Sequence, residues 1–416
     1  MKYKQLTFKE IRNFAIFGSG QFINLVTPLL VAPYVLSICG VENWGKIGVA
    51  TSFYIILGIF IDFGSQLIGV KEISSNKNDV ANITNYLNET YAFRICIFLL
   101  LAFIVTLLLL FVPNIDIQLY GLGSVSLLAQ FLNPIWYYIG KENFASINKI
   151  IFFSKGLFVL LVYVLVKEKS DYVLVVFFLG IANTFVYLYY FIRMYVSNQM
   201  SILSVSLKNL FDLLRKEFPI VVSNLSICIY TQSPIFIINY ILGDYHAGIY
   251  KIGEMILNVF RSYLSVFFNV SFPKFCSIYA DNKANGIFYL KKVNSINILL
   301  LVLGIVCILI FGITILRHIT INRTMYDLVI YYLGFVFIPI VIAVNIPFYQ
   351  FLIFKNKQKI LSRILSFSAI LMLFGCYFFT KYFHLNGSLI AVFAIETIIS
   401  LLIILYCLLT YGSNSK

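Results

Sequence analysis

The chain has 416 residues, of which 61% are hydrophobic and only 12% are charged, and its mean hydropathy is +0.92. A water-soluble domain keeps about a quarter of its residues charged, so this composition excludes a soluble protein. The formal net charge of +14 does not call for a nucleic-acid partner, because the short cytoplasmic loops of membrane proteins collect Lys and Arg.

Apolar runs of about 20 residues recur along the whole chain, which is the length that a helix needs to cross roughly 30 Å of hydrocarbon. Strands of a membrane barrel are about ten residues long and alternate in polarity. The sequence therefore predicts an all-α integral membrane protein of about twelve transmembrane helices. In chain order we expect them at 13–37, 46–70, 86–112, 117–139, 143–166, 172–194, 218–242, 247–271, 293–316, 326–354, 360–380 and 387–411.

The distribution of Lys and Arg between the predicted loops gives the orientation. With the N-terminus inside, twenty of the 31 basic residues fall in cytoplasmic segments and six in outer loops. The positive-inside rule then predicts a multi-pass membrane protein with both termini in the cytoplasm. The first apolar stretch is too long for a signal peptide and lacks a small-x-small cleavage site, so we expect it to stay attached as the first helix.

A sequence pattern recurs in the two halves of the chain. Gly40 and Gly45 stand where the first predicted helix ends and the second begins, and Gly243 and Gly248 stand at the same places between the seventh and eighth. We therefore expect two six-helix lobes with a central cleft between them, as in many carriers. The lobes would comprise residues 1–200 and 217–416, joined by an amphipathic cytoplasmic linker at 201–216.

Ionisable side chains at membrane depth are costly unless they face protein or water, which makes them candidates for function. Arg94, Lys155 and Arg261 have no acid three or four positions away on their own predicted helices. We expect their unbalanced positive charge to hold an anion such as pyrophosphate. Lys251 and Glu254 are at salt-bridge spacing, so a structural ion pair is an equally good interpretation of those two.

Polar residues on the predicted helices one, seven and eight would line the cleft and contact sugars. Lys251, Glu254, Asn258 and Arg261 share one face of the predicted eighth helix, because they are three or four residues apart. The predicted substrate-binding residues are Arg94, Lys155, Lys251, Arg261, Asn24, Asn224 and Asn258. The predicted ion-coupling residues are Asp62, Glu254 and Glu396.

The sequence contains no pattern for a metal site, a cofactor or an enzyme. The seven cysteines form no CxxC pair and the three histidines lack ligand spacing. Walker, GxSxG and HExxH motifs are absent. We therefore expect no metal, no cofactor and no direct use of ATP.

Three segments resemble Wzx-type O-antigen flippases, which form the polysaccharide branch of the multidrug/oligosaccharidyl-lipid/polysaccharide exporter superfamily. Residues 62–73, which begin Asp-Phe-Gly, are similar to the end of helix two in that family. Residues 133–142, Asn-Pro-Ile-Trp-Tyr-Tyr-Ile-Gly-Lys-Glu, are similar to the end of its helix four, and residues 248–279 to its helix eight and exit. The chain departs from the family pattern in having no basic residue at depth on helices one and two.

The resemblance implies a flippase that carries an undecaprenyl-pyrophosphate-linked oligosaccharide from the cytoplasmic to the periplasmic leaflet by alternating access. It also implies coupling to a gradient of H⁺ or Na⁺, contact with membrane lipid, and a polymerase and a chain-length regulator as partners in the same pathway. Two alternatives stay open. One is an ion-coupled drug or small-molecule antiporter of the same superfamily, and the other is a membrane-bound polysaccharide polymerase or ligase, which the short outer loops disfavour.

Overall fold

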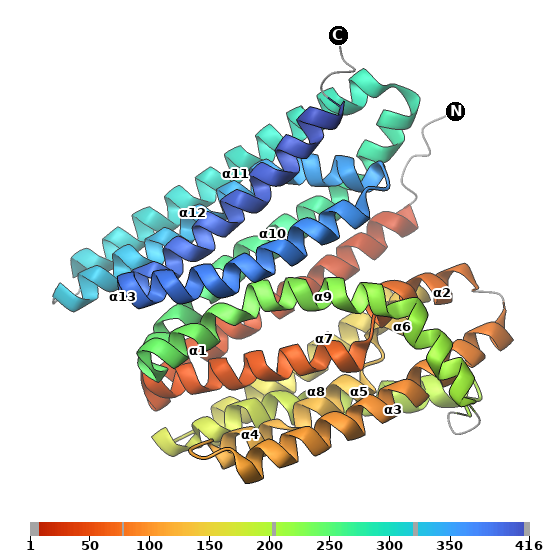
Figure 1. Cartoon of the computed structure of the whole chain (residues 1–416), viewed down its shortest axis with the longest axis horizontal. Helices are drawn as coiled ribbons and strands as arrows, with labels where there is room; N and C mark the ends of the chain where they lie inside the picture. Colours follow the sequence, from red (N-terminus) through yellow and green to blue (C-terminus); the bar gives the residue numbers. More distant parts are fainter. Residues whose placement is uncertain (1–7, 77–78, 202–204, 319–322, 412–416) are drawn as a thin grey trace. The chain divides into compact units, whose positions relative to one another are not determined.

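The computed structural model describes the chain except for residues 1–7, 77–78, 202–204, 319–322 and 412–416 (Figure 1). Within the described residues every regular element is a helix and no strand occurs. The predicted all-α fold class is therefore confirmed. Many large apolar side chains are exposed, and some, such as Leu110 and Phe111, are more than two-thirds exposed. This is the surface expected of a protein whose outside faces lipid rather than water.

The chain divides into two compact units between Cys228 and Ile229. The first unit contains, in order, α1 (Phe8–Asp62), η1 (Ser65–Gly69), α2 (Val70–Ser75), α3 (Val80–Phe111), α4 (Ile117–Gly123), α5 (Val125–Leu132), α6 (Ile135–Gly140), α7 (Phe144–Leu165), η2 (Lys169–Asp171) and α8 (Tyr172–Ser197). Helix α9 (Leu207–Leu242) crosses the division, and the second unit continues with α10 (Asp244–Asp281), α11 (Lys283–His318), α12 (Arg323–Phe354) and α13 (Gln358–Tyr411).

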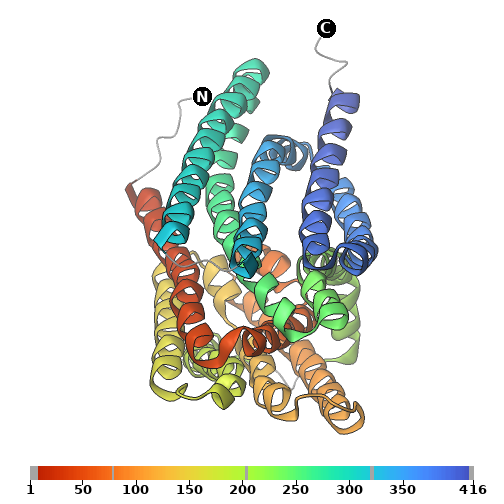
Figure 2. The same cartoon turned by 90° about the vertical axis from the view of Figure 1, so that its left-hand side faces the viewer.

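Each unit is a bundle of packed helices. In the first unit α7 packs against both α1 and α8, and α5 packs against α8. In the second unit α10, α11 and α12 pack against one another and α13 packs along α12, as the long blue-green and blue helices show in both views (Figure 1; Figure 2). The predicted lobe boundaries at 200 and 217 stay a prediction. In the described part of the linker, residues 207–216 belong to α9, and Leu213 packs into the core of the first unit.

Nine helices in the described residues are long and apolar enough to cross a membrane. Two of them consist of two helices joined at a kink, which lies at Gly40 in α1 and at Phe383 and His384 in α13. These kinks fall where the sequence predicts a loop between two spans. The predicted fourth span corresponds to three short helices, α4 to α6. The total of twelve spans stays a prediction, although every predicted span coincides with a helical segment.

The first glycine of the repeated pattern adopts the same backbone conformation in both halves of the chain. Gly40 has φ 82° and ψ 169°, and Gly243 has φ 85° and ψ 178°. This region of φ and ψ is open almost only to glycine. A second pair of equivalent sites is found after α6 and α12, where Glu142 and Asn356 both have φ 56°. Each half of the chain thus turns at equivalent positions in the same way, which supports an internal repeat.

Substituting Gly40 or Gly243 by alanine should destabilise the protein by about 1–3 kcal/mol, because a Cβ makes this backbone conformation strained. No neighbouring atom would obstruct a Cβ at either position, so the effect isolates the backbone. The midpoint of thermal unfolding in detergent measures it. Gly156→Ala, within the regular helix α7 and also free of neighbours, is the matched control and should be neutral or stabilising. Equal midpoints for all three variants would contradict the assignment.

Candidate functional site

The first unit contains a buried ion pair between Arg94 of α3 and Asp62 at the end of α1. The guanidinium Nη2 lies 3.1 Å from Asp62 Oδ1, and the two side chains are 0% and 9% exposed. The expectation that Arg94 carries uncompensated charge is therefore wrong. The acid was not found on its own helix because it comes from a neighbouring one.

The backbone around Asp62 places its carboxylate. Helix α1 stops there because Phe63 and Gly64 adopt positive φ angles of 44° and 84°. The Ser65 hydroxyl then donates to the carbonyl of Asp62 at 2.6 Å, and the amide of Gln66 donates to Asp62 Oδ2 at 3.4 Å. The turn thereby holds the carboxylate toward α3.

Arg94 is held from its other side by carbonyls that a helix end leaves free. Helix α5 ends before Asn133 and Pro134, and the last carbonyls of a helix have no partner within it. Arg94 Nη1 donates to the carbonyl of Asn133 at 3.2 Å and approaches that of Phe131 at 3.5 Å. The motif Asn133-Pro134, which the sequence singled out, thus serves as an acceptor for the buried arginine.

Aromatic rings seal this cluster. The guanidinium carbon of Arg94 lies 5.2 Å from the ring centroid of Tyr91 and 5.4 Å from that of Trp136, and both aromatic side chains are fully buried. Cation–π contacts of this kind gain strength when the cation is desolvated. Arg94 is therefore a buried structural charge, inaccessible to a substrate in this conformation.

A further buried acid, Glu217, was missed by the sequence analysis. It lies in the first half of α9, is only 1% exposed, and accepts a hydrogen bond of 2.7 Å from the hydroxyl of Tyr86. A Cβ on Gly64 would lie 3.6 Å from Glu217 Oε2, so the carboxylate packs against the turn that follows Asp62. From sequence it stood at the boundary between the charged linker and the seventh span, where an exposed acid is the ordinary expectation.

The second unit contains its own ion pair, between Arg261 of α10 and Glu396 of α13. Their Nη2 and Oε1 atoms are 2.6 Å apart, and the side chains are 23% and 7% exposed. The Tyr230 hydroxyl donates to Glu396 and accepts from Arg261 at 3.1 Å. Arg261 is thus also compensated, contrary to expectation, although unlike Arg94 it keeps part of its surface exposed.

Lys251 and Glu254 form the structural ion pair that the sequence left open, with Nζ and Oε2 2.8 Å apart. The structure therefore brings six of the ten predicted site residues together as three pairs: Arg94 with Asp62, Arg261 with Glu396, and Lys251 with Glu254. The three amides are more accessible: Asn258 is exposed, and Asn24 and Asn224 are partly buried.

Lys155 is the predicted cation that keeps no acidic partner within the described chain. It lies in an open groove of about 490 Å³ in the first unit. The groove is formed by Phe22, Ile23, Val26, Thr27 and Leu30 of α1 and by Phe152, Lys155, Gly156, Val159, Leu160, Tyr163 and Val164 of α7. Lys155 is the one charged residue among them, so the groove offers a single cation within an apolar surface.

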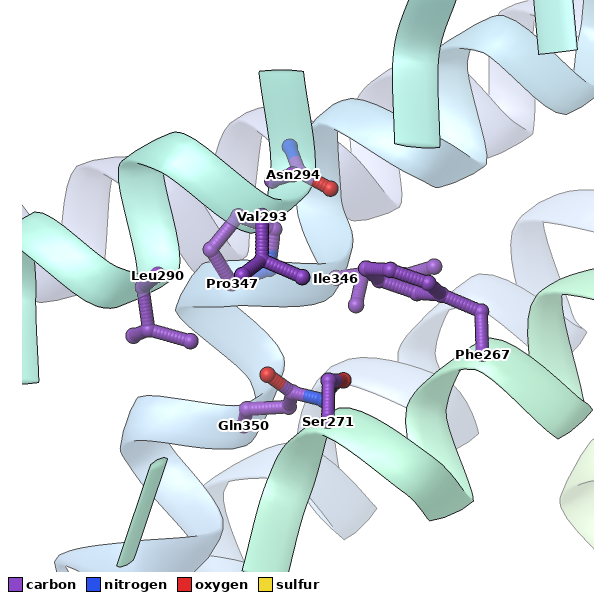
Figure 3. Close-up of a pocket in the computed structure, with 8 residues that line it drawn as sticks. All are labelled: Phe267, Ser271, Leu290, Val293, Asn294, Ile346, Pro347 and Gln350. Atoms are coloured by element: carbon purple, nitrogen blue, oxygen red, sulfur yellow. Dashed lines mark hydrogen bonds between the residues drawn. The ribbon is translucent and has the colours of Figure 1, made fainter. Parts of the chain in front are cut away.

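Two other hollows lie in the second unit. Figure 3 shows the contact between α10, α11 and α12, where Gln350 donates to Ser271 at 2.7 Å and Asn294 lies across the gap; the space is too small for a water molecule. A hollow of about 510 Å³ between α10, α12 and α13 is lined by Tyr245, His246 and His384, among others. Neither contains a predicted site residue.

This arrangement of long kinked helices defines the class of protein. The chain matches an inward-facing multidrug resistance MATE family transporter of the MOP superfamily with a TM-score of 0.69 at 13% identity, covering 95% of each chain. It matches a MOP superfamily transporter from Pyrococcus furiosus with a TM-score of 0.58 at 14% identity, covering 97% of this chain and 95% of the other. At these identities the matches show the fold, which is that of the MATE transporters.

The chain belongs to the family described as polysaccharide biosynthesis protein, whose model matches residues 11–279. It is 23% identical over 399 residues to an Escherichia coli K12 protein named "Putative O-antigen transporter", covering 95% of this chain and 96% of that one. The resemblance to Wzx-type O-antigen flippases is confirmed by these two matches.

Proposed function

We propose that the protein is a flippase that moves an undecaprenyl-pyrophosphate-linked oligosaccharide from the cytoplasmic to the periplasmic leaflet of the bacterial inner membrane. Family membership and the transporter fold support membrane transport of a polysaccharide precursor. The E. coli relative, named as an O-antigen transporter, supports a surface-polysaccharide repeat unit as cargo. The positive-inside pattern supports cytoplasmic termini.

The observation that carries the proposal is the groove around Lys155. A lipid-linked sugar has an anionic phosphate head beside a long hydrocarbon tail. This groove combines an apolar lining with one cation, Lys155, which has no acidic partner among the described residues. Its volume of about 490 Å³ lies within the usual range of ligand sites. An ammonium group can bind phosphate oxygens while the tail stays on the apolar surface of α1 and α7.

Because of the ion pairs, the predicted site residues other than Lys155 are given different roles. Because Arg94 is fully buried, it makes no direct contact with the substrate and contributes to transport only by stabilising the fold. Arg261 and Lys251, which are 23% and 18% exposed, are proposed as secondary contacts for the headgroup. Sugar contacts are assigned to the three accessible amides: Asn24, Asn224 and Asn258. For ion coupling, Asp62, Glu254 and Glu396 remain candidates, each by exchanging its basic partner for H⁺ or Na⁺.

Replacing Lys155 by glutamine should lower surface polysaccharide about tenfold or more, because a charge-assisted hydrogen bond contributes about 1.5–3 kcal/mol. The measurement is polymer on a gel from a strain whose own copy is deleted, with protein level checked by immunoblot. Lys155→Arg should retain most activity. The matched control is Lys149→Gln, which is exposed and lies earlier on α7. Normal polymer from the Lys155→Gln variant would contradict the headgroup assignment.

The drug-antiporter alternative makes a different prediction. A transporter of organic cations would keep exporting them after Lys155→Gln, since removing a positive charge does not weaken binding of a cation. Export of ethidium from cells carrying each variant separates the two functions. The polymerase or ligase alternative is disfavoured because the E. coli relative is named a transporter and the solved structures of similar fold are transporters. Association with a polymerase and a chain-length regulator is part of the proposal and is tested by co-purification.

A further inference from the structure

The buried charges of the first unit do not balance. Asp62 and Glu217 are 7% and 1% exposed, and the side chain that faces them with opposite charge inside the cluster is Arg94, at 0%. Two other groups interact with the Glu217 carboxylate: Tyr86 through a hydrogen bond and Lys216 through its charge. Lys216 is 52% exposed and is already paired with Glu72 at 2.7 Å, and Tyr86 is neutral. With both acids ionised, the sealed cluster would carry one excess negative charge.

An isolated buried carboxylate is so costly that it takes up a proton instead. Asp62 has a direct contact of 3.1 Å with Arg94, which stabilises its ionised form. Among the residues that the structure describes, the hydroxyl of Tyr86 is the one hydrogen-bond partner of the Glu217 carboxylate. The excess charge is therefore relieved at least cost on Glu217, which binds one proton from water and becomes the neutral acid.

A metal cation fits this place poorly. Hard cations such as Ca²⁺ and Mg²⁺ take about six or more oxygen ligands. Here one oxygen of Asp62 is engaged by Arg94 and the other faces the amide of Gln66, and aromatic rings occupy much of the remaining surface. Within the described residues no group of three or more His, Cys, Asp or Glu side chains could hold a metal ion.

We propose that Glu217, balanced against Asp62 and Arg94, is a proton-binding site that links protonation to movement of α9. The position of the residue gives the link. Helix α9 carries Glu217 in the first unit and crosses into the second unit after Cys228, about three helical turns later. When Glu217 loses its proton, a second negative charge lies beside Asp62, and this weakens the packing of α9 against the rest of the first unit.

The site can be tested on purified protein without a substrate. In infrared difference spectra between acidic and alkaline buffer, wild type should show the carbonyl band of a buried carboxylic acid. Glu217→Gln should abolish that band, whereas Glu72→Gln, at the partly exposed ion pair nearby, should leave it unchanged. A band that survives Glu217→Gln would overturn the proposal, as would a band removed by Na⁺ at constant pH.

The variants keep the test interpretable. Glutamine retains an oxygen that accepts from Tyr86, so Glu217→Gln is expected to fold, and Tyr86→Phe keeps the acid while removing its hydrogen bond. Tyr86→Phe should therefore retain the band at a shifted position; its disappearance would contradict the proposal. The single-tryptophan background Trp44→Phe leaves Trp136, which lies against Arg94, as a fluorescent reporter. Its emission should change with pH in that background and should not do so once Glu217→Gln is added.

The consequence for transport rests on the proposed function. There, Glu217→Gln should lower polysaccharide export about tenfold or more at normal protein level, since coupling energies typically correspond to changes of this order. The two proposals fail separately. If export does not need the chain but the infrared band depends on Glu217, the proton site stands and the flippase assignment falls. If export needs the chain and the band survives Glu217→Gln, the flippase assignment stands and the proton site falls.

Discussion

Replacing Arg94 by methionine is expected to remove most of the folded protein from the membrane. The substitution leaves Asp62 and Glu217 buried without their positive partner, and it removes one of the donors to the carbonyl of Asn133, which keeps the Tyr91 hydroxyl. Breaking a buried ion pair by removing one partner costs about 3–5 kcal/mol, which is a large share of a typical total stability of about 5–15 kcal/mol. Immunoblots of membranes and the thermal unfolding midpoint in detergent measure the loss.

The double variant Arg94→Met with Asp62→Asn should recover part of this loss, because it removes the uncompensated charge together with its partner. Arg215→Met is the matched control: Arg215 is exposed on α9, and its loss should leave both measurements unchanged. Wild-type abundance and an unchanged midpoint for Arg94→Met would show that the cluster contributes little to the fold.

The second large effect is expected at Glu396. Its carboxylate accepts from both Arg261 and Tyr230, so Glu396→Ala leaves two donors and one charge without a partner. The expected cost is about 2–4 kcal/mol, less than at Arg94 because Arg261 is 23% exposed and can be hydrated. Export should fall with it, because the exposed edge of Arg261 is a proposed headgroup contact.

Glu396→Gln tests whether charge or hydrogen bonding matters more, since the amide keeps one acceptor oxygen. It should show roughly half of the stability loss of the alanine variant. Thr397→Ala, at the next residue of α13, removes a hydroxyl that donates to the carbonyl of Phe393 on its own helix and should have no effect. If Glu396→Ala behaved like Thr397→Ala, the ion pair would have no energetic role.

Hydrophobic periodicity and length located the helices well, because lipid forces each span to satisfy its own backbone. The repeat of Gly40 and Gly243 was also visible, since the combination of φ and ψ at those two positions is open almost only to glycine. Likewise, the pair Lys251 and Glu254 was accessible from spacing alone, because both residues lie on one helix and three positions apart.

The partners of Arg94 and Arg261 could not be found in this way. Asp62 is 32 positions from Arg94 and Glu396 is 135 positions from Arg261, and only the packing of helices brings them together. A search for acids on the same helix was therefore too narrow. Glu217 was missed for a related reason: nothing local distinguishes an acid buried under Tyr86 from an exposed one at a membrane edge.

The ion pairs of Arg94 and Arg261 change the predicted binding site but leave the predicted fold unchanged. Of the three cations expected to be free, Lys155 alone stays without an acid in the described chain, and it lies in a groove whose other lining is mostly apolar. The proposed cargo still needs both a cation and an apolar surface. The proposed headgroup site is therefore one groove rather than a cluster of arginines.

The most direct measurement asks on which side of the membrane the lipid-linked repeat unit lies. Right-side-out vesicles from cells with and without the protein would be treated with an impermeant reagent that oxidises sugars, in a strain lacking the polymerase. With the protein, we expect most of the lipid-linked sugar to be modified; without it or with Lys155→Gln, the sugar should stay protected until the vesicles are lysed. Equal modification in cells that lack the protein would contradict its role as the flippase.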